Sequence, residues 1–357
     1  MPSLDILNKT FGIVGRRQLR VPVDDLLILL VAVIWGSSYV VMQIVGRHMP
    51  AATFLMLRFV CAMPVLAVAA TRSIRKLTSD EVRTGIFFGC LLFGILILET
   101  VGVRYTSAAN AGFLIAISVV LIPLFERVIN KRHQLAIVYI MTTIALVGCG
   151  LLLLSNATRP RPGDFIILSA ALIRAVQITL FGRRSRFPNQ SLLNVTLIEF
   201  ATVVIVAGLA AFIGARPPWH AITTINAEDW VLIVYLGVLG TSFAFLAQLR
   251  AARATSPTRV GLILSTEPVF ATAFAITWAA NVLSPLQILG GCVIIVAAIV
   301  GRSFEGRTRP AVASLRQAEL VAHGHSGASY DDDCSRPLST CGLSLCWPPI
   351  SGRPRTA

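Results

Sequence analysis

Five charged residues lie inside long apolar stretches of this 357-residue chain: Arg58, Glu99, Arg174, Glu199 and Glu267. A charged side chain at the centre of a lipid bilayer costs about 3 kcal/mol on insertion scales, so it is usually paired or functional. An arginine fork can bind carboxylates, and a carboxyl in apolar surroundings can carry a proton. The residue types therefore indicate ion pairing, contact with a polar solute, or proton transfer.

Depth along an ideal helix, with a rise of about 1.5 Å per residue, predicts which of these residues meet. Arg58 lies about 10 Å, and Glu99 about 8 Å, from the outer ends of their helices. Arg174 and Glu199 both lie about 12 Å from the opposite end. We therefore expect the ion pairs Arg58–Glu99 and Arg174–Glu199. Each pair can be structural or can contact a substrate, because one guanidinium can hold two carboxylates.

Glu267 differs from the other four because no basic residue is expected at its depth. It lies about ten residues into an apolar stretch and precedes Pro268. Desolvation there favours the protonated carboxyl, which makes Glu267 a candidate proton carrier. The alternative is a neutral structural carboxyl bonded to a backbone carbonyl that Pro268 leaves free.

Several uncharged residues could line a cavity beside these charges. One face of the first apolar stretch carries Trp35, Ser38, Tyr39 and Met42 at helical spacing. This face is a candidate cavity wall, although the same pattern is typical of plain helix packing. Asn110 and Gln177 could add hydrogen bonds to a ligand.

Motifs of known enzymes are absent from the sequence. It contains no GxSxG, HExxH, Walker A or dinucleotide-binding pattern. Cys334, Cys341 and Cys346, with His323 and His325 nearby, lack the tight spacing of a zinc site. We therefore expect no enzyme, no catalytic residue, no metal and no cofactor.

Ten apolar stretches must position these side chains. Hydrophobic residues make up 55% of the chain and charged residues 13%. The stretches span residues 26–45, 52–70, 84–103, 108–125, 136–154, 164–181, 192–213, 230–250, 258–280 and 285–301. About 20 apolar residues cross a bilayer as a helix, because lipid offers backbone amides no hydrogen-bond partner. The predicted fold class is an all-α polytopic membrane protein with ten transmembrane helices.

The chain has a net charge of +14, and its basic residues are concentrated in alternate loops between the apolar stretches. One set, which includes both terminal segments, holds 20 lysines and arginines near the helices, whereas the other holds five. The positive-inside rule places the first set, and hence both termini, in the cytoplasm. The charge is thereby explained by topology, and we expect no nucleic-acid partner.

An internal repeat divides the chain into halves. Arg104–Ala108 resembles Arg253–Pro257, and Leu57–Phe59 resembles Ile198–Phe200 with the charge reversed. Five helices per half is an odd number, so the second half must be inverted in the membrane. The predicted domains are a cytoplasmic arm (1–25), two five-helix repeats (26–154 and 164–301) and a disordered cytoplasmic tail (303–357).

Several short motifs lie along the apolar stretches: Trp35–Ser38, Pro50, Arg58–Phe59, Tyr105–Leu114, Thr255–Pro257 and Leu264–Phe270, which includes the Glu-Pro pair. Together these motifs resemble the EamA-like branch of the drug/metabolite transporter superfamily. The resemblance covers about residues 24–301. It implies two inverted five-helix repeats and carrier-mediated movement of small metabolites, often outward. One departure is Arg174, since the aligned position of the first repeat is Trp35.

These observations together predict a secondary transporter of small organic metabolites, amino-acid-like or drug-like, in the cell (inner) membrane. Export by alternating access is the leading expectation. An importer or a lipid-directed carrier on the same scaffold is one alternative. A non-transporting scaffold or an intramembrane enzyme is the alternative from another class. The expected partners are the substrate and the lipid bilayer, and a homodimer is compatible with the sequence.

Overall fold

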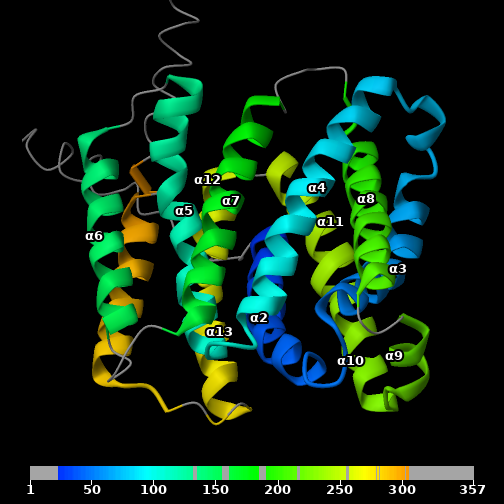
Figure 1. Cartoon of the computed structure of the whole chain (residues 1–357). Coiled ribbons are helices and arrows are strands. Elements are labelled where there is room, and N and C mark those ends of the chain that lie inside the picture. The colour runs from blue at the N-terminus through cyan, green and yellow to red at the C-terminus, as the bar shows by residue number, and fades with distance from the viewer. Residues whose placement is uncertain are drawn as a thin grey trace, which may run out of the picture. The chain divides into compact units, whose positions relative to one another are not determined.

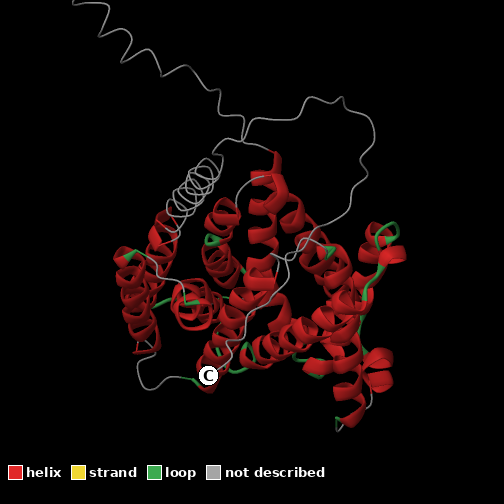
Figure 2. Ribbon diagram, turned by 90° about the horizontal axis from the view of Figure 1, so that it is seen from above, coloured by secondary structure: helices red, strands yellow, loops and turns green. Residues whose placement is uncertain are grey.

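The computed structural model describes residues 23–131, 135–154, 161–184, 190–214, 218–254, 257–278, 280, 282–301 and 303–304. The regular structure of these residues is helical, and none of them forms a strand (Figures 1 and 2). The predicted arm falls almost wholly outside these ranges. The predicted tail does so too, with its cysteines and histidines.

Seven long helices come first in the chain. They are α2 (Val23–Val45), α3 (Ala51–Ala70), α4 (Ser79–Gly102), α5 (Ala108–Asn130), α6 (Ala136–Leu154), α7 (Pro162–Arg184) and α8 (Leu192–Ile213). Shorter elements follow: α9 (Pro218–Thr224), α10 (Ala227–Gly237), the π-helical turn η2 (Val238–Phe243), α11 (Ala244–Ala254), α12 (Pro257–Leu264), α13 (Glu267–Thr277) and a last helix, Pro285–Gly301. A 3₁₀ turn, η1 (Ile74–Lys76), lies between α3 and α4.

Each of the ten predicted ranges overlaps a helix in the described part of the chain. Seven helical segments are long and apolar enough to cross a membrane, and one of them is the continuous run Ala227–Ala251. Three further apolar helices are shorter: Ala136–Leu151, Glu267–Thr277 and Pro285–Gly301. The all-helical fold with several membrane-spanning helices is therefore confirmed, and the count of ten spans stays a prediction.

Local sequence explains where several helices begin. Thr78 and Glu81 form a capping box at the start of α4, in which each side chain bonds the other residue's backbone N–H. Ser107 caps α5 by accepting a hydrogen bond from the backbone N–H of Asn110. Asn226 caps α10 in the same way through Asp229. These caps are local signals for where the helices begin.

Helices that are distant in sequence pack side by side. Helix α3 packs on α8, and α4 packs on both α8 and α7, while α7 also packs on α5 (Figure 1). Helix α2 packs on α11, α12 and α13, and α13 also packs on α5. Phe59 and Phe200 meet edge to face at 5.0 Å between ring centroids in the α3–α8 contact. The interior is thus assembled from both predicted repeats of the chain.

Large apolar residues also cover the outside of the bundle. Val68, for example, is 73% exposed and Ile213 is 86% exposed. A water-soluble protein would expose few contiguous apolar side chains of this size. In a bilayer the same residues face lipid tails, so the exposed apolar surface agrees with the membrane-spanning fold.

Candidate functional site

The ninth predicted helix is broken where Glu267 lies. Helix α12 ends at Leu264 and α13 begins at Glu267, so this carboxyl stands at a helix start rather than inside a helix. Pro268 occupies the first turn of α13, where a missing N–H leaves no intrahelical bond unmade. The alternative in which Pro268 frees a backbone carbonyl inside a continuing helix was therefore wrong, because the helix is already interrupted before it.

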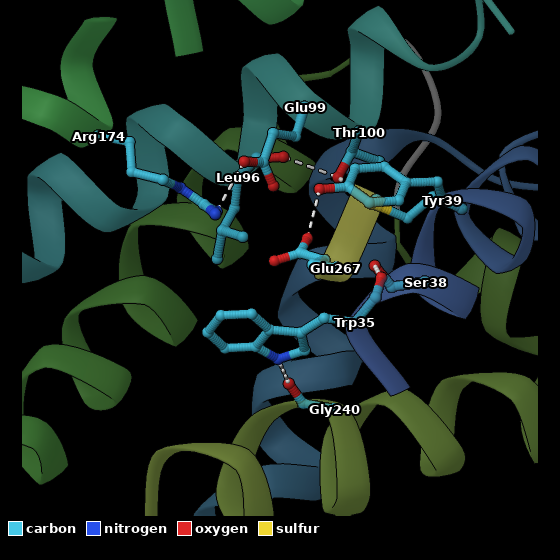
Figure 3. Close-up of polar contacts among 10 residues, drawn as sticks. Trp35, Ser38, Tyr39, Leu96, Glu99, Thr100, Arg174, Gly240 and Glu267 are labelled. Carbon is cyan, nitrogen blue, oxygen red and sulfur yellow. Dashed lines mark hydrogen bonds and ion pairs between the residues drawn. The ribbon is translucent and has the colours of Figure 1, made fainter. Parts of the chain in front are cut away.

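Glu267 has a direct partner on α2. The hydroxyl of Tyr39 donates a hydrogen bond to Glu267 Oε1 at 2.8 Å, and both side chains are buried (Figure 3). Close packing of α13 on α2 sets this contact. A Cβ atom on Gly36 would lie 2.6 Å from Phe270 Cβ and 2.7 Å from the backbone nitrogen of Ala271. Only glycine permits this approach, one turn before Tyr39.

Arg174 of α7 forms an ion pair with Glu99 of α4, with 2.6 Å between Nη2 and Oε1 (Figure 3). The predicted pairs Arg58–Glu99 and Arg174–Glu199 were therefore both wrong. Depth along the helices was an insufficient guide, because it does not say which helix faces which. Helices α4 and α7 pack together, and this packing joins one member of each predicted pair.

Arg58 bonds an uncharged partner instead. Its Nε donates to Thr241 Oγ1 at 2.9 Å, and Thr241 in turn donates to the backbone carbonyl of Leu236. Trp35 Nε1 donates to the carbonyl of Gly240 at 2.8 Å. Both contacts lie in η2, the π-helical turn between α10 and α11. Such turns shift the backbone bonding pattern and occur frequently at functional sites.

Glu199 lies apart from the arginines. Its Oε1 accepts a hydrogen bond from Gln177 Nε2 at 3.2 Å, and the same nitrogen lies 3.3 Å from the carbonyl of Phe88. The contacts of Glu199 in the described part of the chain include no basic residue. Gln177 was expected to face a ligand, and it instead bonds this buried carboxyl.

Asn110 belongs to a different polar cluster. It is 1% exposed, donates to Asp164 Oδ1 at 3.4 Å and accepts from Gln287 Nε2 at 3.0 Å. Asp164 is completely buried and also accepts from the hydroxyl of Thr106. Sequence reasoning missed Asp164, although its place in the first turn of α7 was a readable signal for an anchoring acid.

The structure thus brings five of the predicted residues into one group: Trp35, Tyr39, Glu99, Arg174 and Glu267. Figure 3 draws these side chains around one region, from α2, α4, α7 and α13, with Ser38 beside them. Ser38 itself donates to the carbonyl of Trp35 at 2.6 Å. Arg58 lies within electrostatic reach of Glu99 and Arg174 without touching either. We call this set, with Arg58, the central group.

The central group contains side chains of both charges. Only 5% of the Glu99 side chain and 21% of the Arg174 side chain are exposed. Among the described residues, no three histidine, cysteine, aspartate or glutamate side chains gather as metal ligands would. The arrangement suits recognition of a polar solute inside the membrane.

Helices of this length and apolarity, packed around buried charges, define a multi-pass membrane protein. The sequence profile of the EamA-like transporter family matches this chain twice, over residues 24–154 and 161–301. The chain therefore belongs to the EamA-like transporter family, and it is a membrane transporter. The resemblance seen in the sequence is confirmed.

Two curated relatives carry the name "Uncharacterized transporter", and both come from Archaeoglobus fulgidus. One is 28% identical over 281 residues, which cover 77% of this chain and 84% of the relative. The other is 23% identical over 262 residues, which cover 70% and 87%. A solved structure, titled only as the crystal structure of a protein, matches with a TM-score of 0.55 and 18% identity over 80% of this chain and 98% of that one. This match supports the fold alone.

Proposed function

We propose that this protein is a secondary transporter that exports small organic metabolites, amino-acid-like or drug-like, across the cell membrane. The observation that carries the proposal is the central group, in which Arg174, Glu99, Tyr39 and Glu267 meet inside the apolar bundle. These residues come from both family matches, two from each. A substrate site between two halves, close to a broken helix, is the usual arrangement in secondary transporters.

Helix packing supports an arrangement of two inverted five-helix repeats. The first helix of each matched section packs on the third and fourth helices of the other: α2 on α11, α12 and α13, and α7 on α4 and α5. The two second helices, α3 and α8, pack on each other, as do the two fourth helices, α5 and α13. A pseudo-twofold axis in the membrane plane would produce this reciprocal pattern. Rocking of one half against the other would then alternate access to the central group.

Loop charge supports a topology with both termini in the cytoplasm. The bias of 20 basic residues against five is large enough to set orientation. A reporter fused after Arg72 should report the cytoplasm, and one fused after Arg159 should report the outside. The opposite pattern would contradict the proposed topology.

Arg174 is the proposed contact for a substrate carboxylate. Its side chain is 21% exposed, and a guanidinium fork can bind a second carboxylate while it holds Glu99. Trp35 adds an aromatic surface to the same region (Figure 3). Because a bound carboxylate would compete with Glu267 for the charge of Arg174, we propose that Glu267 takes up a proton when substrate binds. Substrate binding would then be coupled to proton movement.

Two linked measurements test the function. First, an untargeted comparison of metabolites in cells with and without the protein should reveal compounds depleted inside cells that express it. Second, the compound that differs most should move through proteoliposomes containing the purified protein. Arg174→Gln should reduce this flux at least tenfold, whereas Arg250→Gln, a matched change at an exposed arginine, should leave it unchanged.

The alternatives predict different results. Accumulation inside expressing cells would indicate an importer, and movement of labelled lipid between leaflets would indicate a lipid-directed carrier. If the purified protein moves none of the compounds whose levels differ between the two kinds of cell, a scaffold or an enzyme would be favoured. The proton step has its own variant, Glu267→Gln. It should abolish accumulation driven by a pH gradient and retain exchange at equal pH.

A further inference from the structure

Glu199 is a buried carboxyl that the proposed transport mechanism does not use. It lies eight residues into α8 and is 5% exposed. The backbone of α4 crosses α8 closely here, since a Cβ atom on Gly89 would lie 2.8 Å from the carbonyl oxygen of Glu199. Among the described residues, the amide of Gln177 on α7 donates a hydrogen bond to this carboxyl. Glu199 is therefore enclosed by three helices.

The charges of the central group compensate one another. Arg174 pairs with Glu99 and attracts Glu267, while Arg58 lies within reach of Glu99. Two arginines thus face two glutamates, and the Tyr39 hydroxyl adds a hydrogen bond to Glu267. The net charge of the central group is therefore zero when Glu199 is left out.

Neighbouring helices offer Glu199 no compensating charge among the described residues. On α4, Glu81 bonds Ser191 and Asn194, while Asp80 and Arg83 are exposed at the helix start. On α9, His220 is exposed. Arg58 on α3 bonds Thr241, and Arg174 on α7 bonds Glu99. An ionised Glu199 would be an isolated charge in apolar surroundings, which is strongly unfavourable.

Gln177 is oriented to hold the neutral acid. Its Nε2 donates toward both the carbonyl of Phe88 and Glu199 Oε1, and this fixes which end of the amide faces the carboxyl. Glu199 Oε1 therefore acts as an acceptor, and the other oxygen is free to carry a hydrogen. A single neutral amide donor does not replace the hydration of a full carboxylate charge.

We propose that Glu199 is a second proton-binding site of this carrier, separate from the Tyr39–Glu267 pair. The inference rests on the proposed transport function and extends it to a carboxyl held by Gln177, one turn after Arg174 on α7. In the present conformation the O–H bond of Glu199 is intact. When the end of the bundle at which α8 begins admits water, that bond breaks, the proton passes to water and the carboxylate remains. Closure of that end returns the proton.

Infrared difference spectroscopy of the purified protein tests this without a substrate. The spectrum of the wild-type protein minus that of Glu199→Gln at neutral pH should contain the C=O stretch of a protonated carboxylic acid. The band should shift after transfer to D₂O, because the proton exchanges with water. As a matched control, the wild-type spectrum minus that of Asp24→Asn should contain carboxylate bands, since Asp24 pairs with Arg250. Carboxylate bands for Glu199, or an acid band that never shifts in D₂O, would overturn the proposal.

A second variant covers the case in which Glu199→Gln fails to fold. Gln177→Leu removes the amide that bonds Glu199, so the acid C=O band should move to higher frequency while its intensity is retained. An unchanged spectrum would show that no such acid exists at Glu199.

Transport assays separate this proposal from the general one. In proteoliposomes, Glu199→Gln should abolish the effect of a pH gradient on the flux of the compound found in the metabolite comparison, even with Glu267 present. If the wild-type protein moves no compound, the transport function fails, and the infrared bands still decide whether Glu199 holds an exchangeable proton. If the wild type transports and Glu199→Gln responds fully to the gradient, the second site is wrong and the transport function stands.

Discussion

Two ends of the helical bundle place an acid at the same structural position but give it different partners. Glu81 and Asp229 are each the third residue of a helix, α4 and α10, and each backbone N–H bonds the capping side chain. Both acids are buried. Glu81 accepts from the backbone N–H of Ser191 at 2.6 Å and from the amide of Asn194 at 3.0 Å, whereas Asp229 lies 2.9 Å from His48 Nδ1.

A second pair of acids shows the same difference. In this pair, the acid with uncharged donors lies at the end of the bundle where the first pair has the acid with a basic partner. Asp24 and Asp164 lie in the first turns of α2 and α7. Asp164 is completely buried and accepts from Thr106, Asn110 and the backbone N–H of Arg161. Asp24 accepts from Arg250 Nε at 2.8 Å, and 65% of the Arg250 side chain is exposed.

The positions of these acids correspond at the two ends, whereas the kinds of partner differ. Each end joins the two matched sections through one acid with uncharged donors and one acid with a basic, partly exposed partner. Buried acids with several fixed donors are costly to remove, whereas exposed ion pairs contribute little. The two kinds of anchor should therefore differ in energy and in their response to salt, although their positions correspond.

The largest expected effect is that of Asp164→Ala. The change leaves the buried donors of Thr106 and Asn110 without their acceptor, and unsatisfied buried groups cost about 1–3 kcal/mol each. The midpoint of thermal unfolding in detergent, followed by size-exclusion chromatography, should fall well below that of the wild type. Asp24→Ala is the matched control at the equivalent position. Equal losses for the two variants would remove the contrast between the anchors.

Glu81→Gln should have the next largest effect, about 1–3 kcal/mol. The new side-chain NH₂ group would meet the backbone N–H of Ser191 or the amide of Asn194, which are themselves donors. The same unfolding assay measures the loss. A midpoint equal to that of the wild type would show that this anchor does not need both carboxylate oxygens as acceptors.

Sequence patterns were sufficient for the helices and insufficient for the contacts between them. The predicted range 192–213 coincides with α8, because apolar runs ended by glycine, proline or charge are local signals. The partner of Arg174 depends on which helix packs against α7, and one sequence does not contain that information. The break before Glu267 was missed for a related reason: Ser265 and Thr266 are compatible with a helix, and only the packing of α13 on α2 requires the interruption.

His48→Ala tests the anchor at Asp229 and should cost about 1 kcal/mol, less than Glu81→Gln. Asp229 keeps its first-turn position and its capping partner Asn226, and water can reach the place of the removed imidazole because 47% of the His48 side chain is exposed. His48→Gln should retain most of the stability by donating a neutral hydrogen bond. A loss as large as that of Asp164→Ala would mean that the two kinds of anchor do not differ in energy.

The smallest expected effect belongs to the Asp24–Arg250 pair, whose members join α2 to α11. Exposed ion pairs contribute about 0.2–1 kcal/mol, because water and side-chain entropy offset most of the attraction. Salt should weaken it further, since the Debye length falls from about 10 Å at 0.1 M to about 3 Å at 1 M. A double-mutant cycle with Asp24→Asn and Arg250→Gln at low and high salt measures the coupling. We expect a small coupling energy that disappears at 1 M salt. A coupling that persists at 1 M salt would mean that this pair, like Asp164 and its donors, is held by fixed geometry. Asp24 and Asp164 would then be equivalent in energy as well as in position.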